Sequence, residues 1–509
     1  MKVIATTPRS ACFELENQRP YYAEKEFEIL LDGKTVRTEN RNVFSLFNLS
    51  PDTAYTLTAD GEKVQFKTDS EKYLFNVKCF NAIGDGIRDD TSAFTAAISC
   101  MPEGSTLYIP AGTYLLRPLF LKSGITLYLE KGATLLGSAV REDYPVLPAT
   151  VAGEREINLG TWQGEEAPCF ASLVTAYAGT NIKITGEGVI DCNATAGDWY
   201  ENYRVMRTAW RPRGVFLNNC TNVLLHGVTV KNTPSWNIHP FFSKDVKLFD
   251  LTLENKPDMP TTDGIDADFC DGVEIAGVKI SVGDDCVAIK SGTLEMARKR
   301  RTPCKNVTIR NCLMKSGHGG VVLGSELSGG IENITVEKCL FLGTDRGLRI
   351  KTRRGRGREG RCGNITFSNI EMRDVKVPFS VNMYYNMGDN NGHSEYVWTT
   401  EKLPVDERTP AIGTLTFKDM VCTGVEYSAG VFYGLPESPI AGVTLKNVSF
   451  SYNPKAGYGY PDMREKNEKV RRQGLYFAFT DTVTLENVKI EGQDGDAVIT
   501  DGVRKIDRK

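Results

Sequence analysis

The stretch Asn306-Val307-Thr308-Ile309 is one copy of a short pattern that recurs along most of the chain. In each copy an Asn, Asp or Gly precedes apolar or β-branched residues that alternate along the chain, and this period of two predicts β-strands. Successive copies lie mostly about 23 to 40 residues apart, which is the range of stacked structural repeats. The other copies are Asn181-Ile182-Lys183-Ile184, Asn222-Val223-Leu224-Leu225, Asp245-Val246-Lys247-Leu248, Gly272-Val273-Glu274-Ile275, Asn333-Ile334-Thr335-Val336 and Asn364-Ile365-Thr366-Phe367, with later ones near Thr414, Gly442 and Thr482.

These repeats have almost no helical periodicity, so they predict a parallel β-helix rather than a helical or leucine-rich array. A β-propeller is the main alternative, but its blades need a more even period and about four strands each. One helix is predicted near the start, where Asp89-Asp90-Thr91-Ser92 precedes an apolar run at 93–98 and would cap the open end of the solenoid. We therefore predict an all-β chain in which residues 73–509 form a parallel β-helix.

Residues 1–70 have a different pattern and predict a separate module. Alternating runs such as Phe27-Glu28-Ile29-Leu30-Leu31 and Val64-Gln65-Phe66-Lys67 are separated from their neighbours by Asp-Gly turns. Short strands at this spacing predict a small β-sandwich. The segment Leu49-Ser50-Pro51-Asp52-Thr53-Ala54-Tyr55 resembles the loop and tyrosine strand of fibronectin type III domains. The alternative is an irregular β-extension of the main domain.

The composition excludes some classes of protein. Lys and Arg number 61 against 64 Asp and Glu, giving a formal net charge of -3, so the chain has no global basic field and nucleic acid is not an expected partner. The 13 cysteines are an odd number without a Cys-x-x-Cys pair, which indicates neither a zinc site nor a disulfide framework. No stretch approaches the roughly 18 apolar residues of a membrane span, and no apolar secretory segment is visible near Met1. We expect a cytoplasmic protein without a membrane partner.

Three aspartates and a histidine stand beside glycines on successive repeats. Aligning the strands that follow them places Asp263 over Asp285 and Asp284 over His318, each pair one coil apart. Because neighbouring strands lie about 4.8 Å apart, we expect the three carboxyl groups to converge. The aligned segments are Ile265-Asp266-Ala267, Val287-Ala288-Ile289, Val321-Val322-Leu323 and Leu348-Arg349-Ile350.

Converging carboxyl groups can supply both an acid and a base. Repulsion between them raises the pKa of at least one, and hydrolysis of a glycosidic bond needs one protonated and one ionised carboxyl group. His318 lies between Gly317 and Gly319, which permit a close approach of the backbone. An isolated Asp-Asp turn is usually a solvated loop, and a histidine at a turn can be structural, but their stacking favours a catalytic site.

Arg349 and Lys351 are two residues apart and therefore share a face of their strand. This is the outer face, because Leu348 and Ile350 take the inward positions. Two cations beside an acid cluster suit a sugar that carries a carboxylate, although they can also form a solvated strand face. The basic stretch at 353–358 is open to the same two interpretations: contacts with further uronates, or a solvated loop.

The residues together resemble a known family, the polygalacturonases of glycoside hydrolase family 28. Its four signatures correspond, in the same order, to Thr261-Thr262-Asp263, Gly283-Asp284-Asp285, Gly317-His318-Gly319 and Arg349-Ile350-Lys351. Thr261 stands where the family has Asn, which puts in doubt the substrate contact made there. The resemblance covers most of residues 73–500 and implies a right-handed parallel β-helix of the pectin-lyase-like kind.

The same resemblance implies the reaction and the roles of the residues. The enzyme would cleave α-1,4-linked galacturonic acid in pectin or oligogalacturonides with inversion and without a cofactor or metal. Asp284 would be the general acid, and Asp263 and Asp285 would position and deprotonate water. His318 would support the protonation of the acid, and the two cations Arg349 and Lys351 would hold a galacturonate carboxylate.

Attack at a chain end is the expected mode. Residues 293–301 lengthen one coil and resemble insertions of bacterial exo-acting members, and a cytoplasmic enzyme would meet short imported oligosaccharides. One alternative is a rhamnogalacturonan or substituted-galacturonan hydrolase, but rhamnogalacturonan-cleaving relatives generally lack the third and fourth signatures. A second is a non-catalytic β-helix adhesin or structural protein, which has no need of stacked acids. A third is a pectate lyase, which needs a strong base near Ca²⁺ ligands. The oligomeric state is left open.

Overall fold

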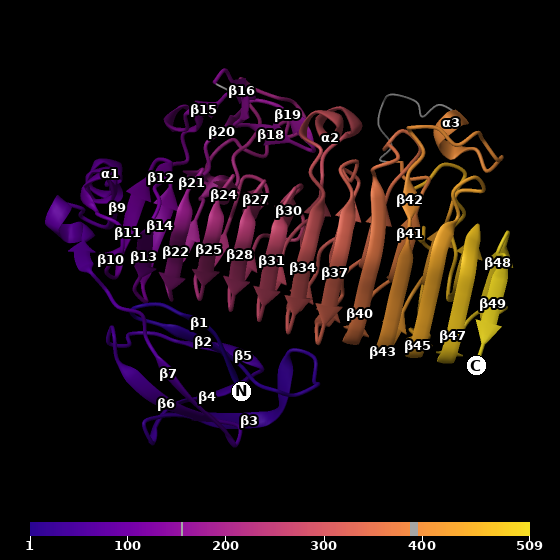
Figure 1. Cartoon of the computed structure of the whole chain (residues 1–509), viewed down its shortest axis with the longest axis horizontal. Helices are drawn as coiled ribbons and strands as arrows, with labels where there is room; N and C mark the ends of the chain where they lie inside the picture. Colours follow the sequence, from indigo (N-terminus) through magenta and orange to yellow (C-terminus); the bar gives the residue numbers. More distant parts are fainter. Residues whose placement is uncertain (154–155, 387–394) are drawn as a thin grey trace.

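The computed structural model describes residues 1–153, 156–386 and 395–509. Within these ranges the chain forms a long solenoid with a small module beside it (Figure 1). Parallel strands make two large sheets, one 24-stranded and one 12-stranded, and consecutive coils add neighbouring strands to each sheet. This is the right-handed parallel β-helix that the repeats and the family resemblance predict.

The 12-stranded sheet contains β12 (Leu119–Leu121), β21 (Val174–Tyr177), β24 (Val215–Asn218), β27 (Ile238–Phe241), β30 (Ile265–Asp268), β33 (Val287–Lys290), β36 (Val321–Gly324), β39 (Arg346–Lys351), β41 (Val377–Asn382), β44 (Ser428–Tyr433), β46 (Gln473–Ala478) and β48 (Val498–Asp501).

The 24-stranded sheet contains β8 (Tyr73–Asn76), β9 (Asp85–Asp89), β10 (Ser105–Ile109), β11 (Gly112–Leu116), β13 (Ile125–Leu129), β14 (Ala133–Gly137), β22 (Thr180–Gly186), β23 (Val189–Asp191), β25 (Thr221–His226), β26 (Thr229–Lys231), β28 (Lys244–Phe249), β29 (Thr252–Glu254), β31 (Asp271–Ala276), β32 (Lys279–Ser281), β34 (Cys304–Arg310), β35 (Leu313–Lys315), β37 (Ile331–Glu337), β38 (Leu340–Leu342), β40 (Arg361–Arg373), β42 (Ala411–Ile412), β43 (Thr414–Val425), β45 (Ile440–Tyr452), β47 (Thr480–Glu491) and β49 (Lys505–Arg508).

The asparagine that opens several repeats has a physical reason. Asn306 and Asn333 have φ angles of 57° and 58°, a left-handed conformation that Asn adopts more readily than most residues. Their side chains also stack, because the amide of Asn333 donates to the oxygen of Asn306 at 3.1 Å and the amide of Asn364 donates to Asn333 at 2.7 Å. The repeat thus combines a left-handed residue near the start of a strand with a hydrogen bond between coils.

The core of the solenoid is apolar and continuous. Inward residues such as Ile265, Val287, Val321 and Leu348 are fully buried and belong to one cluster that runs through the coils. The predicted register is confirmed, since Ile265 pairs with Val287, Val287 with Val321, and Val321 with Leu348. The apolar core therefore fixes which residues of each strand face outward.

Helices and short strands lie in the connections between the strands of this solenoid. The predicted helix is confirmed as α1 (Thr91–Cys100), which packs buried alanines, Phe94 and Ile98 onto the first coils. No helix in the described ranges is long and apolar enough to cross a membrane. The remaining elements are α2 (Leu294–Arg300), α3 (Glu395–Trp398), the 3-10 helices η1 (Val77–Phe80), η2 (Arg141–Asp143) and η3 (Ala194–Ala196), and the short strands β15 (Val146–Leu147), β16 (Thr150–Val151), β17 (Ile157–Asn158), β18 (Thr161–Trp162), β19 (Glu165–Glu166) and β20 (Cys169–Phe170).

The N-terminal module is made of two antiparallel sheets, as a β-sandwich requires. One sheet has the order β1-β2-β5 and the other β4-β3-β6-β7, and residues such as Phe13, Ile29 and Phe44 fill the space between them. The likeness to fibronectin type III domains and the boundary at residue 70 stay predictions. The strands are β1 (Lys2–Thr6), β2 (Ala11–Glu14), β3 (Tyr22–Leu31), β4 (Lys34–Arg41), β5 (Val43–Leu46), β6 (Ala54–Ala59) and β7 (Glu62–Lys67).

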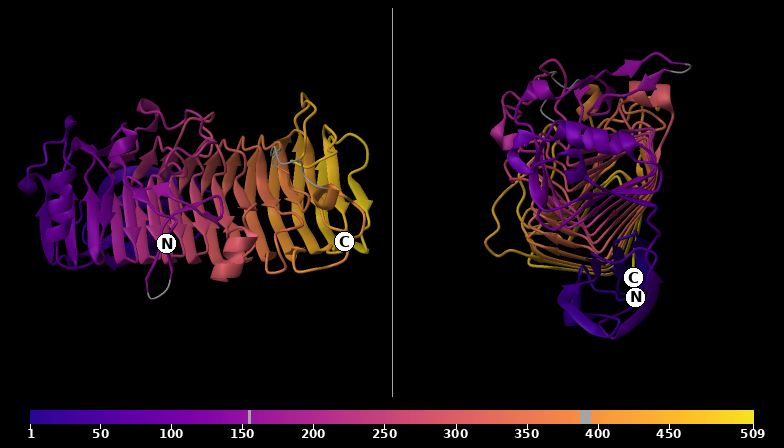
Figure 2. Two further views of the ribbon diagram at one scale, coloured as in Figure 1. Left: turned by 90° about the horizontal axis from the view of Figure 1, so that it is seen from above. Right: turned by 90° about the vertical axis from the view of Figure 1, so that its left-hand side faces the viewer.

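The module is docked on the solenoid by buried charges. Glu14 accepts hydrogen bonds from Arg310 at 2.8 Å and Asn311 at 2.7 Å and lies 3.5 Å from the ammonium of Lys338. Views from the side and from the end of the solenoid show the module on the side opposite the loops that carry β15 to β20 (Figure 2). The module is therefore fixed to the solenoid but lies away from those loops.

Replacing Glu14 with Ala is expected to loosen this docking. The change removes a buried carboxylate from Arg310 and Lys338, of which Arg310 keeps Glu274 at 2.6 Å, and costs about 3 kcal/mol, the low end for breaking a buried ion pair. Limited proteolysis should then cut faster between residues 67 and 73, and the thermal unfolding temperature should fall. Glu16→Ala is the control, because the side chain of Glu16 is 53% exposed and its contact with Lys2 is 4.0 Å long. Equal cleavage rates in both variants would contradict this role of Glu14.

Candidate active site

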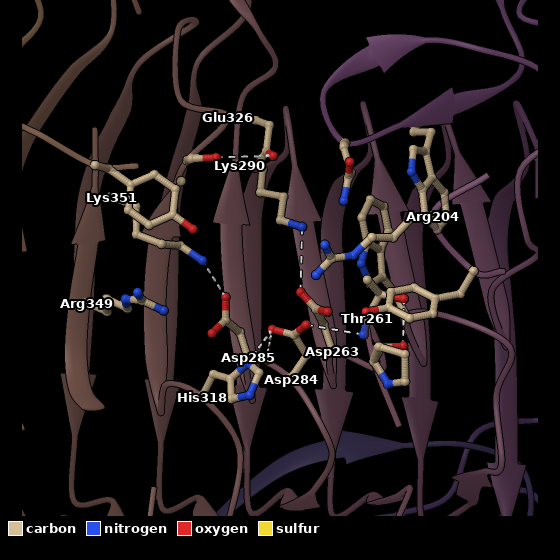
Figure 3. A pocket seen from close by; sticks show the side chains of 18 of the residues that line it. Arg204, Thr261, Asp263, Asp284, Asp285, Lys290, His318, Glu326, Arg349 and Lys351 are labelled. Atoms are coloured by element: carbon tan, nitrogen blue, oxygen red, sulfur yellow. Dashed lines mark hydrogen bonds and ion pairs between the residues drawn. The ribbon is translucent and has the colours of Figure 1, made fainter. Parts of the chain in front are cut away.

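Three acids lie where consecutive strands of the 12-stranded sheet begin. Asp263 precedes β30, Asp284 and Asp285 precede β33, and His318 precedes β36. The strand register continues into these turns, because Gly264 N–H donates to the Asp285 carbonyl at 2.9 Å and His318 N–H donates to the Asp284 carbonyl at 3.0 Å. Carboxylate oxygens of the three aspartates lie within 4.8 Å of one another, and Figure 3 shows their convergence. The expected acid cluster is present.

Backbone geometry places His318 against Asp284. Gly317 has a φ of +95°, and a Cβ there would lie 2.6 Å from the Asp284 carbonyl oxygen, so the position requires glycine. The imidazole Nδ1 of His318 then lies 3.3 Å from Asp284 Oδ1. On the other side of the same carboxyl group, Thr261 N–H donates to Oδ2 at 3.2 Å. Asp284 is thus held between two neighbouring coils.

Two of the three carboxyl groups, Asp263 and Asp284, have pKa values shifted in opposite directions. Burial raises the pKa of Asp263 well above its ordinary value, and the negative charges of Asp266, Asp284 and Asp285 add to this rise. Burial also acts to raise the pKa of Asp284, but the hydrogen bond from His318 and the nearby cations outweigh it and lower that pKa to about 2. The same hydrogen bond raises the pKa of His318. In the free site a proton therefore binds Asp263 more readily than Asp284.

This distribution agrees in part with the sequence argument. At least one carboxyl group has a raised pKa, as expected from their crowding, and it is that of Asp263. The family resemblance gives the acid role to Asp284, whose pKa is lowered in the free site. The raised pKa of His318 favours the imidazolium form, so a proton is nevertheless stored beside Asp284.

Two lysines compensate the acids from the neighbouring strands. The ammonium of Lys351 on β39 lies 2.8 Å from Asp285 Oδ2. The ammonium of Lys290 on β33 lies 3.6 Å from Asp263 Oδ2. Because His318 lies beside Asp284, each aspartate of the cluster thus has a cationic side chain next to it. The carboxylates are close enough to share an ion, but the expectation of a site without metal or cofactor stays a prediction.

Arg349 and Lys351 lie on the outer face, as predicted, with Leu348 and Ile350 in the core. Arg349 is not a solvated cation, because it is 6% exposed and its Nη2 donates to Asp462 Oδ1 at 2.7 Å. Asp462 is itself buried and reaches Arg349 from the connection between β45 and β46. The alternative of a solvated strand face is therefore wrong for both cations.

These residues line one cleft of about 450 Å³. All six predicted site residues contribute to it. On the side of the earlier coils the lining continues with aromatic and cationic side chains, and on the side of the later coils with residues of three connecting segments. The further lining residues are Trp162, Gln163, Tyr203, Arg204, Trp210, Arg211, Trp236, Pro260, Thr261, Lys290, Gly324, Ser325, Glu326, Tyr385 and Met463.

Sequence reasoning missed several of these contributors for different reasons. Lys290 and its partner Asp266 could have been identified, because Asp266 stands in the aligned segment Ile265-Asp266-Ala267 and pairs with Ala288 across the sheet. Extending the aligned columns by one position in β33 adds Lys290, which follows Ala288 by two residues. Asp462 and Trp162 carry no such signal, since they lie on connections whose path depends on the rest of the fold.

Thr261 replaces the family asparagine with a strained residue. Its φ is 56°, a left-handed conformation that is unfavourable for a β-branched side chain. The hydroxyl accepts from Arg211 Nη2 at 2.5 Å and donates to the Pro260 carbonyl at 2.6 Å. The side chain therefore contacts the protein, while its backbone N–H orients Asp284.

The two basic segments beside the motifs have structural partners. Residues 293–301 contain α2, whose Lys299 donates to Glu166 of β19 at 2.6 Å. Arg354 of the 353–358 stretch is 2% exposed and donates to Glu437 at 2.6 Å and to the Thr399 carbonyl at 2.7 Å. A solvated loop is therefore the wrong interpretation for Arg354, whereas contacts of the 353–358 stretch with further uronates stay a prediction.

Comparison with known proteins places this chain among the glycoside hydrolases. Residues 105–458 match the profile of glycosyl hydrolases family 28. The chain is 31% identical over 385 residues to a probable polygalacturonase of Vitis vinifera, covering 74% of each chain. The chain belongs to glycosyl hydrolases family 28 and is a glycoside hydrolase.

Two relatives named for different activities, one exo-acting and one endo-acting, are identical to this chain to the same degree. It is 28% identical to an exo-poly-alpha-D-galacturonosidase of Dickeya chrysanthemi over 72% of this chain and 65% of that one. It is also 28% identical to an endo-polygalacturonase of Pectobacterium carotovorum over 71% and 84%. Its fold matches the family 28 exopolygalacturonase of Yersinia enterocolitica with a TM-score of 0.72 at 21% identity, covering 100% and 97%. An exopolygalacturonase of Thermotoga maritima matches with a TM-score of 0.65 at 25% identity, covering 82% and 92%.

Proposed function

We propose that this enzyme hydrolyses α-1,4-linked galacturonic acid in oligogalacturonides or pectin, releasing sugar from a chain end with inversion. The observation that carries the proposal is the convergence of Asp263, Asp284, Asp285 and His318 in a cleft that also contains Arg349 and Lys351. Family membership and relatives named as polygalacturonases support the substrate class.

Asp284 is assigned as the general acid. Its side chain is 25% exposed, against 6% for Asp263 and 3% for Asp285, so it is the carboxyl group most accessible to a glycosidic oxygen. The proton held by the Asp284–His318 pair passes through Asp284 to that oxygen as the bond to the anomeric carbon breaks. His318 then carries no charge until it takes up the next proton.

Asp263 and Asp285 are assigned the role of positioning and deprotonating the attacking water. Asp285 Oδ1 is buried and has no hydrogen-bond partner among the described residues, so it is available to accept from a water molecule. The raised pKa of Asp263 makes its carboxylate a stronger base than an ordinary aspartate. The water attacks the anomeric carbon, and its proton passes to one of these two carboxylates.

Arg349 and Lys351 are assigned the role of binding the carboxylate of a galacturonate unit. Both cations stand beside the ring of Tyr385, with the Arg349 guanidinium 5.6 Å and the Lys351 ammonium 5.7 Å from its centroid. Their charges are shared with Asp462 and Asp285, which hold them at the cleft without removing them from it. An anionic sugar therefore meets cations already fixed in position, which lowers the entropic cost of binding.

Attack at a chain end is supported by the side chains on one side of the acids. Trp162 and Gln163 line the cleft from the loops of β15 to β20, and Tyr203 and Arg204 line it from the connection before β24. Side chains in this position would stop a long chain from continuing past the acids. The expected cytoplasmic location, under which substrates are short imported oligosaccharides, fits the same proposal.

Asp284→Asn is expected to abolish hydrolysis and leave the fold intact. The amide keeps the size of the side chain but cannot supply a proton, so the rate on oligogalacturonides should fall by at least about 100-fold, the lower value for loss of a general acid. Reducing-sugar release measures the rate, and circular dichroism measures the fold. Turnover near that of the wild type would exclude Asp284 as the acid.

Inversion predicts that the β-anomer of the sugar appears first from the α-linked substrate. The separation of the carboxylates makes this a stringent test, because oxygens within 4.8 Å lie closer than the roughly 6.5–9.5 Å usual for inverting enzymes. Proton NMR during the first minutes distinguishes the anomers before they interconvert. The α-anomer as first product would instead show retention.

Exo action predicts the monomer or one short product from the first time point on a defined oligogalacturonide. The reason is that only a chain end fits beside the walled side of the cleft. Chromatography of early products measures this, with a rhamnogalacturonan oligosaccharide as the comparison substrate. A ladder of lengths would show endo action, and faster cleavage of the comparison substrate would favour the rhamnogalacturonan alternative.

A further inference from the structure

Lys290 contacts two carboxyl groups at once. It ends β33, and its side chain is 7% exposed and points outward from the sheet toward the cleft (Figure 3). Its ammonium lies 2.6 Å from Asp266 Oδ1, 3.6 Å from Asp263 Oδ2 and 4.0 Å from the centroid of the Trp236 ring. One positive charge is therefore shared between two aspartates.

The two aspartates differ in access to the cleft. Asp263 lines it, whereas Asp266 is absent from the lining formed by the described residues and its side chain is fully buried. Asp266 is the second residue of β30 and lies beside Ala288 in the sheet, two residues before Lys290. The residue with no access to substrate thus has the shorter contact with the lysine.

A cation shared in this way cannot compensate both acids fully. The attraction between charges falls with distance, so the closer Asp266 takes the larger part of the Lys290 charge. Asp266 also repels Asp263 directly. Other ionisable groups surround this set. The groups that interact with Asp263, Asp266 or Lys290 are Arg213, His239, Asp268, Asp284, Asp285 and Glu326.

We propose that Lys290 and Asp266 are positioning residues with opposite effects on Asp263: Lys290 favours its carboxylate form, and Asp266 weakens that effect. Neither residue needs to touch the reacting atoms. The inference rests on the proposed function and takes Asp263, of the two carboxylates beside the water, as the one that must be ionised to accept its proton. The pair then sets the lowest pH at which the enzyme works.

The sign of each effect follows from the charges. Burial and the neighbouring acids, Asp266 first among them, raise the pKa of Asp263, and Lys290 lowers it. As the pH falls through this pKa the base is lost, so kcat/KM declines on the acidic side. Removing Lys290 raises the pKa and moves the decline to higher pH. Removing the charge of Asp266 lowers the pKa and moves the decline to lower pH.

The experiment compares the pH dependence of kcat/KM on trigalacturonate for the wild type, Lys290→Met and Asp266→Asn. The acidic decline should move up by about one pH unit in Lys290→Met and down by about one unit in Asp266→Asn, the low end for a charge at this distance. Lys290→Arg is the matched control, because it keeps the positive charge. Its acidic decline should stay within about 0.3 unit of the wild type, even where kcat falls.

Shifts in opposite directions distinguish this role from a structural one. A packing defect lowers kcat/KM at every pH but does not move the acidic declines of the two variants in opposite directions. Shifts in the same direction, no shift, or an equal shift in Lys290→Arg would overturn the proposal. If Lys290→Met does not fold by circular dichroism, Asp266→Asn decides alone, since the amide is nearly isosteric with the acid. A wild type that is inactive on trigalacturonate contradicts the proposed function and this inference with it, whereas an active wild type without opposite shifts contradicts this inference only.

Discussion

The in-register stacking of parallel strands is the constraint on which the rest of this structure depends. Each coil adds strands in register to both large sheets, and the pairing of Ile265, Val287, Val321 and Leu348 keeps the apolar residues in a single core. Because side chains alternate between faces, a shift by one residue would turn the whole apolar set outward. The register that protects the core therefore also decides which polar residues meet outside it.

The stacking of the strands creates electrostatic repulsion between the acids of the site. Strand spacing brings three carboxyl groups within 4.8 Å, which is unfavourable unless cations or protons compensate them. Lys351, Lys290 and His318 each contact one of the acids. Burial and the neighbouring acids still raise the pKa of Asp263, whereas the hydrogen bond from His318 and the nearby cations lower the pKa of Asp284. The same unfavourable crowding that a structural protein would avoid is what gives an enzyme an acid and a base side by side.

Much of the fold and part of the site could be predicted because they follow from local pattern. The period of two, the recurring asparagine near the start of several strands and the glycines beside Asp284 and His318 are all visible in the chain. Aligning the repeats was enough to place Asp263 over Asp285 and Asp284 over His318. Asp266 already stands in that alignment, and extending it by one residue adds Lys290, so their omission was not a physical limit. The charge distribution within the cluster was beyond reach, since it depends on burial.

The sequence by itself determined the solenoid, its register and the identity of the acid cluster, because each of these depends on residues whose spacing is regular along the chain. Only the tertiary structure decided what surrounds that cluster. Asp462 pairs with Arg349 across 113 positions, Trp162 reaches the cleft from a long connection, and Arg354 is buried against Glu437 rather than exposed. Such contacts form between irregular connections, whose paths are set by packing against the finished solenoid rather than by any period in the sequence.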